Sequence, residues 1–307
     1  MKKTTILFLL ALCAFGVRAQ ESDADSLLNA GDVKFFKTGD MRGAFRDYSR
    51  AKDKGNAMAM FMLGRCYAEG HGTDQSLQRA VELWQRASLQ GVGDASLKIA
   101  TMYQYGVGFD KDFSKAAKWY NLAASQGSEE AMYVMGEKYF YGIGGLPQDT
   151  DRGIDFWTRA AELGHKEAQA ELGMQYYVGS KVKRNMLLSV DYFQRASDQG
   201  HAKAAFYAGL FNEKGYGKLA DEVSAAYYYM VAAGGGITDA QVNLGNLYHD
   251  GRGVEKNLKK AFDWWLEAAK NNNTQAQHNV AQCYLNGEGT AKDEKAGRKW
   301  LQLASQE

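Results

Sequence analysis

Residues 240–272 read AQVNLGNLYHDGRGVEKNLKKAFDWWLEAAKNN, and the same pattern recurs along almost the whole chain. Seven regularly spaced glycines mark its period: Gly70, Gly106, Gly142, Gly179, Gly215, Gly251 and Gly287. Neighbouring glycines in this series lie 36 residues apart, except for one interval of 37. A fixed period of this length is typical of a solenoid, in which one supersecondary unit stacks on the next. The period therefore predicts a repeat array.

The first half of each unit has the pattern of an amphipathic helix, called helix A below. An alanine precedes each of the seven glycines by eleven residues, a small residue follows that alanine by five, and a tyrosine usually comes three later. In the quoted stretch these are Ala240, Gly245 and Tyr248. Such spacing places them on one helix face. Glycine inside a helix costs about 1 kcal/mol relative to alanine, so its recurrence predicts close contact between helices.

The second half of each unit is predicted to form another helix, called helix B below. It begins at a preferred N-cap residue in eight successive units: Asp40, Ser76, Asp112, Asp149, Asn185, Asp221, Asn257 and Asp293. A small residue, a large one and an alanine follow, as in Ala261, Trp265 and Ala268. The helix then ends at a glycine or at Asn272, residue types that tolerate a left-handed C′ conformation.

The combined motif is Ala-x4-Gly-x2-Tyr-x2-Gly-x-Gly, a capping Asp or Asn, then Ala-x3-aromatic-x2-Ala-x3-Gly. It resembles the Sel1-like repeat family, whose members are relatives of tetratricopeptide repeats, over residues 40–307. The resemblance implies an all-α fold, a right-handed α-solenoid superhelix of about eight helix–turn–helix hairpins. Residues 20–39 lack the alanine, glycine and tyrosine columns, and we interpret them as an N-terminal capping helix, which solenoids need for solubility.

Residues 1–19 have the features of a bacterial secretory signal peptide. Lys2 and Lys3 precede the apolar run Ile6–Phe15, and a small-x-small cleavage site follows at 17–19. Lipidation of Cys13 is the alternative, but the residue before it is bulky. No later apolar run approaches the ~20 residues of a membrane span. We expect an exported mature chain, either periplasmic or secreted, with no membrane span.

Several motifs invite a catalytic or metal-binding interpretation, and none is supported by its context. Ser-x-x-Lys motifs begin at Ser49 and Ser180, and Lys37–Gly39 matches Lys-Thr-Gly of penicillin-recognising enzymes. They fall in predicted helices or turns, and Ser-Asp-Asn is absent. His165 and His201 share a repeat position without Cys, Asp or Glu at fixed helical spacing. We therefore predict no catalytic residue, no cofactor and no metal site.

Cys66 and Cys283 are the two cysteines of the expected mature chain, and both stand just before a helix A tyrosine. Six repeats separate them, so an extended solenoid would hold them much too far apart for a disulfide. We predict buried free thiols. The cysteine-rich branch of the Sel1-like family carries a disulfide in each repeat and has been associated with penicillin binding. The absence of those pairs weakens that association here.

The outward face of helix A is the candidate binding surface. Positions 2, 3, 6, 9 and 10 after the first alanine point away from the predicted core, and the resemblance implies that helix A lines a concave surface. The candidate partner-binding residues are Phe61, Tyr105, Tyr133, Phe140, Tyr141, Tyr177, Phe206 and Tyr207. Aromatic side chains dominate binding hot spots, so this face suits an extended peptide. The alternative is that several rings pack on the adjacent helix A.

These features predict a non-enzymatic protein- or peptide-binding adaptor of the bacterial cell envelope. A net charge of +1 gives no field to attract nucleic acid. The alternative function is a hydrolase or binder acting on peptidoglycan or β-lactam-like ligands, although no nucleophile, base and oxyanion set is organised in the sequence. A third alternative is an assembly protein that oligomerises through the ends of its solenoid.

Overall fold

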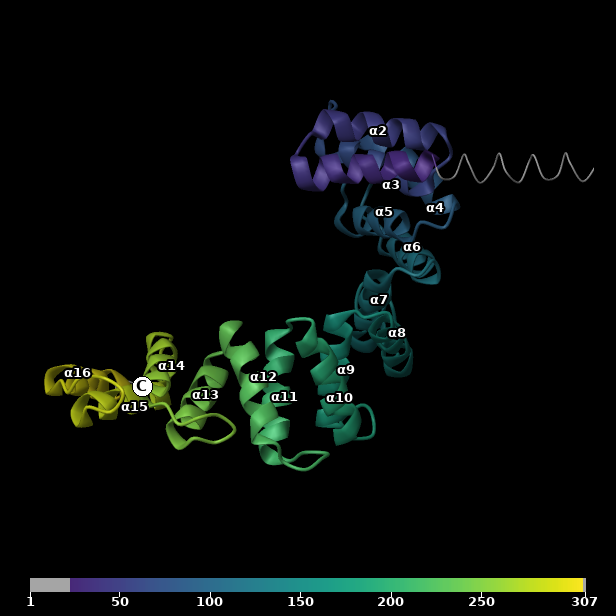
Figure 1. The fold of residues 1–307 in the computed structure, drawn as a ribbon. Helices are drawn as coiled ribbons and strands as arrows, with labels where there is room; N and C mark the ends of the chain where they lie inside the picture. Colours follow the sequence, from purple (N-terminus) through teal and green to yellow (C-terminus); the bar gives the residue numbers. More distant parts are fainter. Residues whose placement is uncertain (1–22, 306–307) are drawn as a thin grey trace, which may run out of the picture. The chain divides into compact units, whose positions relative to one another are not determined.

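The computed structural model describes residues 23–305, which form helices and turns without any strand (Figure 1). Residues 23–32 are α-helical and continue into the π-helical turn η1 (Val33–Thr38). The helices A are α3 (Ala57–Glu69), α5 (Gly93–Tyr105), α7 (Glu129–Tyr141), α9 (Lys166–Val178), α11 (Ala202–Lys214), α13 (Thr238–Asp250) and α15 (Thr274–Asn286). The helices B are α2 (Met41–Asp53), α4 (Leu77–Leu89), α6 (Phe113–Ser125), α8 (Thr150–Glu162), α10 (Met186–Asp198), α12 (Glu222–Gly234), α14 (Leu258–Lys270) and α16 (Glu294–Ala304).

With the segment 23–38 as the first arm, these helices make the predicted eight hairpins. The proposed signal peptide lies outside the described residues. Within residues 23–305 no helix has both the length and the apolar character needed to cross a membrane.

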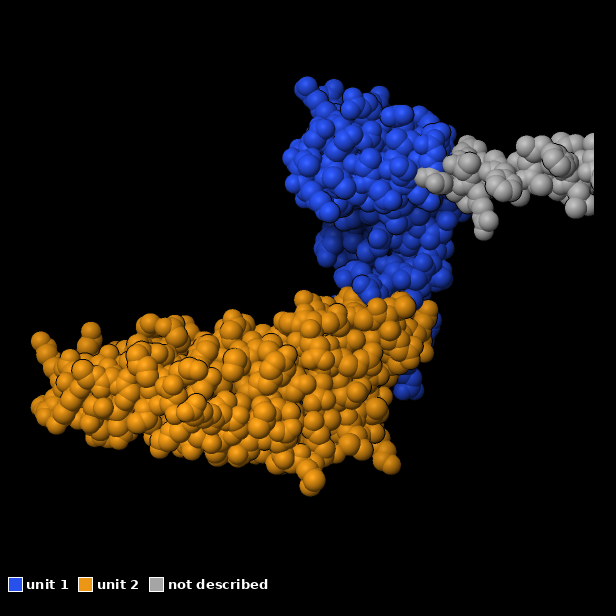
Figure 2. All heavy atoms as spheres, in the orientation of Figure 1, with its two compact units in different colours: residues 1–153 blue, residues 154–307 orange. Residues whose placement is uncertain are grey.

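The chain divides into two compact units, Met1–Gly153 and Ile154–Glu307, with the boundary inside α8 (Figure 2). In each unit, helices pack in chain order. In the first unit α3 contacts α4, α4 contacts α5 and α5 contacts α6. In the second, contacts continue in the same way from α9 to α16. Each unit is therefore built mainly from nearest-neighbour contacts, as expected of a solenoid.

Hydrogen bonds confirm all eight predicted N-caps of helix B. Each capping side chain accepts a bond from the backbone N–H three residues later, as Asn257 Oδ1 does from Lys260 at 2.9 Å. The backbone N–H of the cap also donates to the carbonyl of the helix A tyrosine position, as from Asn257 to Tyr248 at 2.8 Å. This second bond recurs in all seven hairpins that begin with α3 and later helices A. It fixes both ends of the turn between the two helices.

The glycine column of helix A marks close contact with helix B, as the sequence predicts. A Cβ atom added to Gly245 would lie 2.4 Å from Trp265 Nε1, and one added to Gly173 would lie 2.7 Å from Phe193 Cδ1. Trp265 Nε1 also donates to the Val242 carbonyl at 3.3 Å. The large ring of helix B therefore covers the bare backbone of helix A, where any side chain would displace it.

The prediction that residues 20–39 lack the glycine column is wrong. Gly31 performs this role, because a Cβ added there would lie 2.6 Å from Tyr48 Cε1. Gly31 stands nine residues before the N-cap Asp40, whereas Gly64 stands twelve before Ser76. The short π-helical connection puts Gly31 out of register with the later units, so the period conceals it.

The shared position of His165 and His201 has a structural role that the sequence analysis did not identify. His165 Nδ1 accepts a bond from the Ala168 N–H at 3.2 Å, and His201 Nδ1 accepts one from Ala204 at 3.1 Å. Both histidines therefore N-cap a helix A, as Asn273 does at the same repeat position. An imidazole accepts a hydrogen bond at Nδ1 only in its neutral form.

We predict that Gly173→Ala lowers the free energy of unfolding by about 1–3 kcal/mol, because the new methyl group must displace the Phe193 ring. Gly234→Ala is the matched control, since a Cβ at this helical glycine meets nothing within 4 Å. It should be neutral or stabilising by up to about 1 kcal/mol. Denaturant melts compare the two. Equal stability of the two variants would contradict the close-contact account.

We predict that His201 makes stability depend on pH. Burial lowers the pKa of His201 below its ordinary value of 6.5, with Glu167 acting in the opposite direction. The folded state thus favours neutral imidazole, so the contribution of this cap is present above pH 6.5 and is lost as pH falls through the folded pKa. His201→Asn keeps a capping side chain that does not titrate. It should lose less stability than the parent between pH 7.5 and 5, and an identical loss in thermal melts would contradict the assignment.

Candidate partner-binding site

Two of the eight predicted partner-binding aromatics are buried, so the prediction that they point outward is wrong. Phe61 is 7% exposed and Phe140 is 5% exposed. Phe61 belongs to the core that α2–α5 share. At Phe140, α8 comes so close that a Cβ on Gly153 would lie 2.8 Å from the Phe140 backbone nitrogen. Both rings border the core face, and neighbouring helices cover them.

Four others are half-buried. Tyr177 on α9 and Tyr207 on α11 form the packing between adjacent helices A that the sequence left as an alternative. Tyr207 stacks on Phe193 with ring centroids 4.9 Å apart and an interplanar angle of 14°. The ring centroids of Tyr177 and Tyr207 lie 6.0 Å apart. Phe206 packs against the hydrophobic core around Tyr229. The hydroxyl of the fourth, Tyr133, donates to Glu137 Oε1 at 3.1 Å.

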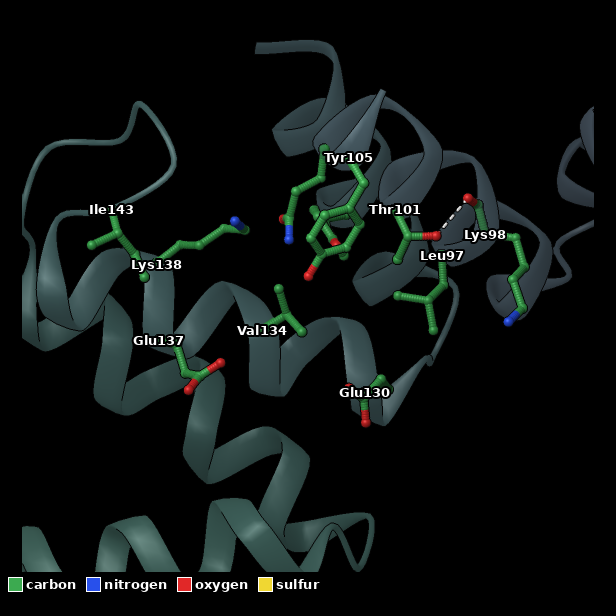
Figure 3. Close-up of a pocket in the computed structure, with 11 residues that line it drawn as sticks. Leu97, Lys98, Thr101, Tyr105, Glu130, Val134, Glu137, Lys138 and Ile143 are labelled. Atoms are coloured by element: carbon green, nitrogen blue, oxygen red, sulfur yellow. Dashed lines mark hydrogen bonds between the residues drawn. The ribbon is translucent and has the colours of Figure 1, made fainter. Parts of the chain in front are cut away.

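The remaining two, Tyr105 and Tyr141, are 69% and 51% exposed. Tyr105 lines a cavity of about 390 Å³ between α5 and α7 (Figure 3). The α5 wall consists of all five outward positions of that helix. The complete lining is Leu97, Lys98, Thr101, Gln104, Tyr105, Tyr120, Glu130, Val134, Glu137, Lys138 and Ile143. The predicted outward face of helix A therefore does border a cavity, but only one predicted aromatic lines it.

Lys138 is the most unusual group in this cavity. Its repeat position belongs to the core and holds Met102, Phe211, Leu247 and Cys283 in other units. Lys138 is only 7% exposed, and no ion pair found within residues 23–305 includes it. Its Nζ lies 5.4 Å from the centroid of the Tyr120 ring. Burial lowers the pKa of Lys138, and the nearby Glu137 carboxylate partly offsets this effect.

Two further polar groups complete the interior of the cavity. Gln104 Oε1 is buried and accepts no hydrogen bond within the described part of the chain. The Tyr120 side chain is buried, and burial with the neighbouring Tyr105 and Glu130 raises the pKa of its phenol above the ordinary value. The cavity thus offers an ammonium donor and an unused amide acceptor among aromatic and aliphatic side chains.

A second cavity occupies the corresponding place in the other unit, between α13 and α15. It measures about 250 Å³ and is lined by Asn246, His249, Trp265, Gln275, Asn279, Gln282, Cys283 and Glu288. Trp265 stands where Tyr120 stands in the first, and Cys283 stands where Lys138 does. The cavity is therefore a recurrent product of the repeat geometry, and the buried ammonium is particular to the α5–α7 copy.

The prediction of buried thiols is confirmed for both cysteines. Cys66 is 0% exposed and Cys283 is 3% exposed. Burial raises the pKa of each thiol to about 11. Among residues 23–305, no group of three or more His, Cys, Asp or Glu side chains could hold a metal ion.

Paired helices in a fixed register, with cavities between successive helices A, define an α-solenoid repeat protein. The model of the Sel1 repeat family matches residues 57–92, 93–128, 129–165, 166–201, 202–236, 238–273 and 274–307. The chain belongs to the Sel1 repeat family. The first matched repeat begins at α3, so α2 and the segment 23–38 precede the matched repeats.

Solved structures show the same fold. A protective antigen of uropathogenic Escherichia coli with an SLR fold, c5321, is 27% identical with a TM-score of 0.78, and the match covers 94% of this chain. This chain spans 62% of that protein. A Sel1 repeat protein from Oxalobacter formigenes is 26% identical with a TM-score of 0.58, over 95% of this chain and 86% of that one. A search of curated protein sequences found no match.

We predict that both thiols are unreactive in the folded protein. With a pKa of about 11, roughly one thiol in a thousand is ionised at pH 8, and burial blocks access to it. Iodoacetamide should modify neither cysteine in the native state and both after denaturation without reductant, as mass spectrometry can count. The variants Cys66→Ala and Cys283→Ala show which cysteine gives each alkylation signal, because each variant lacks one of the two thiols. Fewer than two modified thiols in the denatured protein would contradict the free-thiol prediction.

Proposed function

We propose that this chain is a protein- or peptide-binding scaffold of the bacterial cell envelope that holds its partner against the helix A face. Proteins of the Sel1 repeat family are in general non-catalytic scaffolds for protein–protein interaction. The observation that carries the proposal is the α5–α7 cavity, which opens among outward positions of helix A. Pockets that combine apolar walls with a few convergent polar groups are the usual form of a recognition site.

The rim of this cavity supplies suitable anchor residues. Tyr105 is 69% exposed and Ile143 is 50% exposed, and both line the cavity. Rigid aromatic and aliphatic side chains of this kind contribute most of the binding energy in many interfaces. In the second unit, Tyr177, Phe206 and Tyr207 are committed to packing, so we place the main anchors on α5 and on the turn after α7.

The location is proposed from the sequence of residues 1–19, whose charge and apolar run are typical of a secretory signal peptide. The absence of catalysis is likewise a proposal. Ser49 lies on α2. Lys52 of the same Ser-x-x-Lys motif forms an ion pair with Asp53, Nζ to Oδ1 at 2.7 Å, and is not placed to act as a base toward the Ser49 hydroxyl. A nitrocefin turnover assay tests the alternative of a β-lactam-related hydrolase, and we expect no turnover above background.

We predict that Tyr105→Ala with Ile143→Ala reduces partner capture at least tenfold, because each good anchor contributes about 2 kcal/mol. The measurement is affinity capture of partners from the cell-envelope fraction of the source bacterium by the immobilised mature protein, quantified by mass spectrometry. The thermal melting temperature of each variant is recorded in parallel.

The matched control is Tyr227→Ala with Met230→Ala, which removes two exposed side chains, 56% and 43% accessible, from α12, a helix B. It should capture the same partners as the parent protein. Equal capture by all three proteins would move the binding surface away from the α5–α7 cavity. Loss of capture by the helix B control alone would assign binding to the helix B surface of the second unit.

A further inference from the structure

Lys138 occupies a position where a charge is costly. The side chain is 7% exposed and forms no ion pair among residues 23–305, and its Nζ lies 5.4 Å from the centroid of the Tyr120 ring. A charge in such a place loses part of its hydration, and proteins normally pair it or replace it by an apolar residue. Met102 in the preceding unit shows that an unbranched apolar chain fits there, and Lys138 is the single charged residue that this repeat position holds in the seven helices A. The charge therefore points to a use beyond stability.

The local geometry directs this ammonium into the cavity. In Figure 3 the Lys138 side chain extends from α7 toward Tyr105. The turn after α7 closes over it, since a Cβ on Gly144 would lie 2.8 Å from Nζ. That turn, residues 142–149, also contains the extra residue of the single 37-residue interval. The turn that contains the extra residue therefore lies next to the Lys138 ammonium.

Gln104 gives an independent indication of a ligand. The Gln104 side chain lines the same cavity, and its Oε1 atom is buried and accepts no hydrogen bond within residues 23–305. A buried acceptor without a donor is destabilising, because it has lost its hydrogen bonds to water and gained none in return. A ligand that satisfies both groups must bring an anionic acceptor to Lys138 and a donor to Gln104.

The charges of the lining select a monoanion. Glu130 and Glu137 border the cavity together with Lys98 on the rim and Lys138 inside, so a dianionic phosphate would meet two carboxylates while only one ammonium lies in the interior. A carboxylate carries one charge and fits one ammonium donor. A peptide also supplies the donor, as a backbone N–H close to the carboxylate, and an apolar side chain that can pack on Leu97, Val134 and Ile143.

We propose that the α5–α7 cavity binds a peptide carboxylate, with Lys138 donating to the carboxylate and Gln104 Oε1 accepting from a nearby peptide N–H. The proposal rests on the proposed function, because it specifies the chemistry of the partner segment. The carboxylate comes from either a chain terminus or an Asp or Glu side chain.

The test is NMR titration of the ¹⁵N-labelled mature protein with three short peptides. N-acetyl-Ala-Leu has a free terminal carboxylate, N-acetyl-Ala-Leu-amide has none, and N-acetyl-Leu-Asp-Leu-amide has only a side-chain carboxylate. We expect saturable shifts in residues 97–105 and 130–143 with one or both acids and none with the amide. The preferred acid identifies the source of the carboxylate. Equal shifts with the amide, or no shifts with either acid, would overturn the proposal.

Two variants separate ligand binding from folding. Lys138→Met should weaken binding of the acid at least tenfold while the melting temperature stays equal or rises, because an unpaired buried charge is removed. Gln104→Glu places a competing carboxylate inside the cavity and should also abolish binding. Lys98→Met removes an exposed lysine from the rim and should change affinity less than threefold. Retained binding in Lys138→Met, or equal losses in Lys98→Met, would overturn the role of Lys138.

The experiment also distinguishes the two proposals. If partner capture depends on Tyr105 and Ile143 but neither acid binds, the scaffold function stands and the carboxylate chemistry fails. If an acid binds through Lys138 and envelope capture is unaffected by the rim variants, the cavity is a small-ligand site and the partner-binding surface of the scaffold lies elsewhere.

Discussion

The contact between a large ring of helix B and a bare stretch of helix A backbone determines most of this structure. At Gly64, Gly173, Gly209 and Gly245 the ring lies so close that a Cβ would come within 2.7 Å of it. The penalty for glycine inside a helix is offset because the ring covers the backbone and, at Trp84 and Trp265, donates to a helix A carbonyl group. The small alanine columns preserve the same close approach along each unit, and the hairpins can then stack at a constant period.

The period of the sequence was sufficient to predict the helices, because each boundary is set by a local interaction. The cap residues, the left-handed residues after helix B and the glycine column all act within one hairpin, so their spacing carries the information directly. Gly31 escaped recognition because a shorter connection moves it out of register. The capping role of His165 and His201 escaped because histidine is an uncommon N-cap, although Asn56 and Asn273 at the same repeat position pointed to it.

The candidate site was less predictable for a physical reason. Helical phase shows which residues lie away from the core of their own hairpin, but it does not show how far the next hairpin covers them. Phe61 was assigned an outward position and is nevertheless buried, and Tyr177 and Tyr207 are half-buried against neighbouring rings. Conversely, Lys138 occupies a core position and reaches a cavity through the length of its side chain. Interpretation of such an array needs both the phase of each helix and the geometry of the pair of repeats around it.

The hydrogen bond from each helix B cap to the tyrosine-position carbonyl has a consequence for how such arrays diversify. It holds the two ends of the turn together through backbone atoms, while the turn itself packs on the preceding unit. A Cβ on Gly72, Gly253 or Gly289 would lie 2.0–2.2 Å from the carbonyl oxygen of the first residue of the preceding helix B. The turn at 142–149 has accepted an additional residue while the Asp149 to Tyr139 bond remains at 2.8 Å, and a Cβ on its Gly145 would meet nothing closer than 3.5 Å. An insertion can therefore keep the hairpin closed while it relaxes the contact of the turn with the preceding unit.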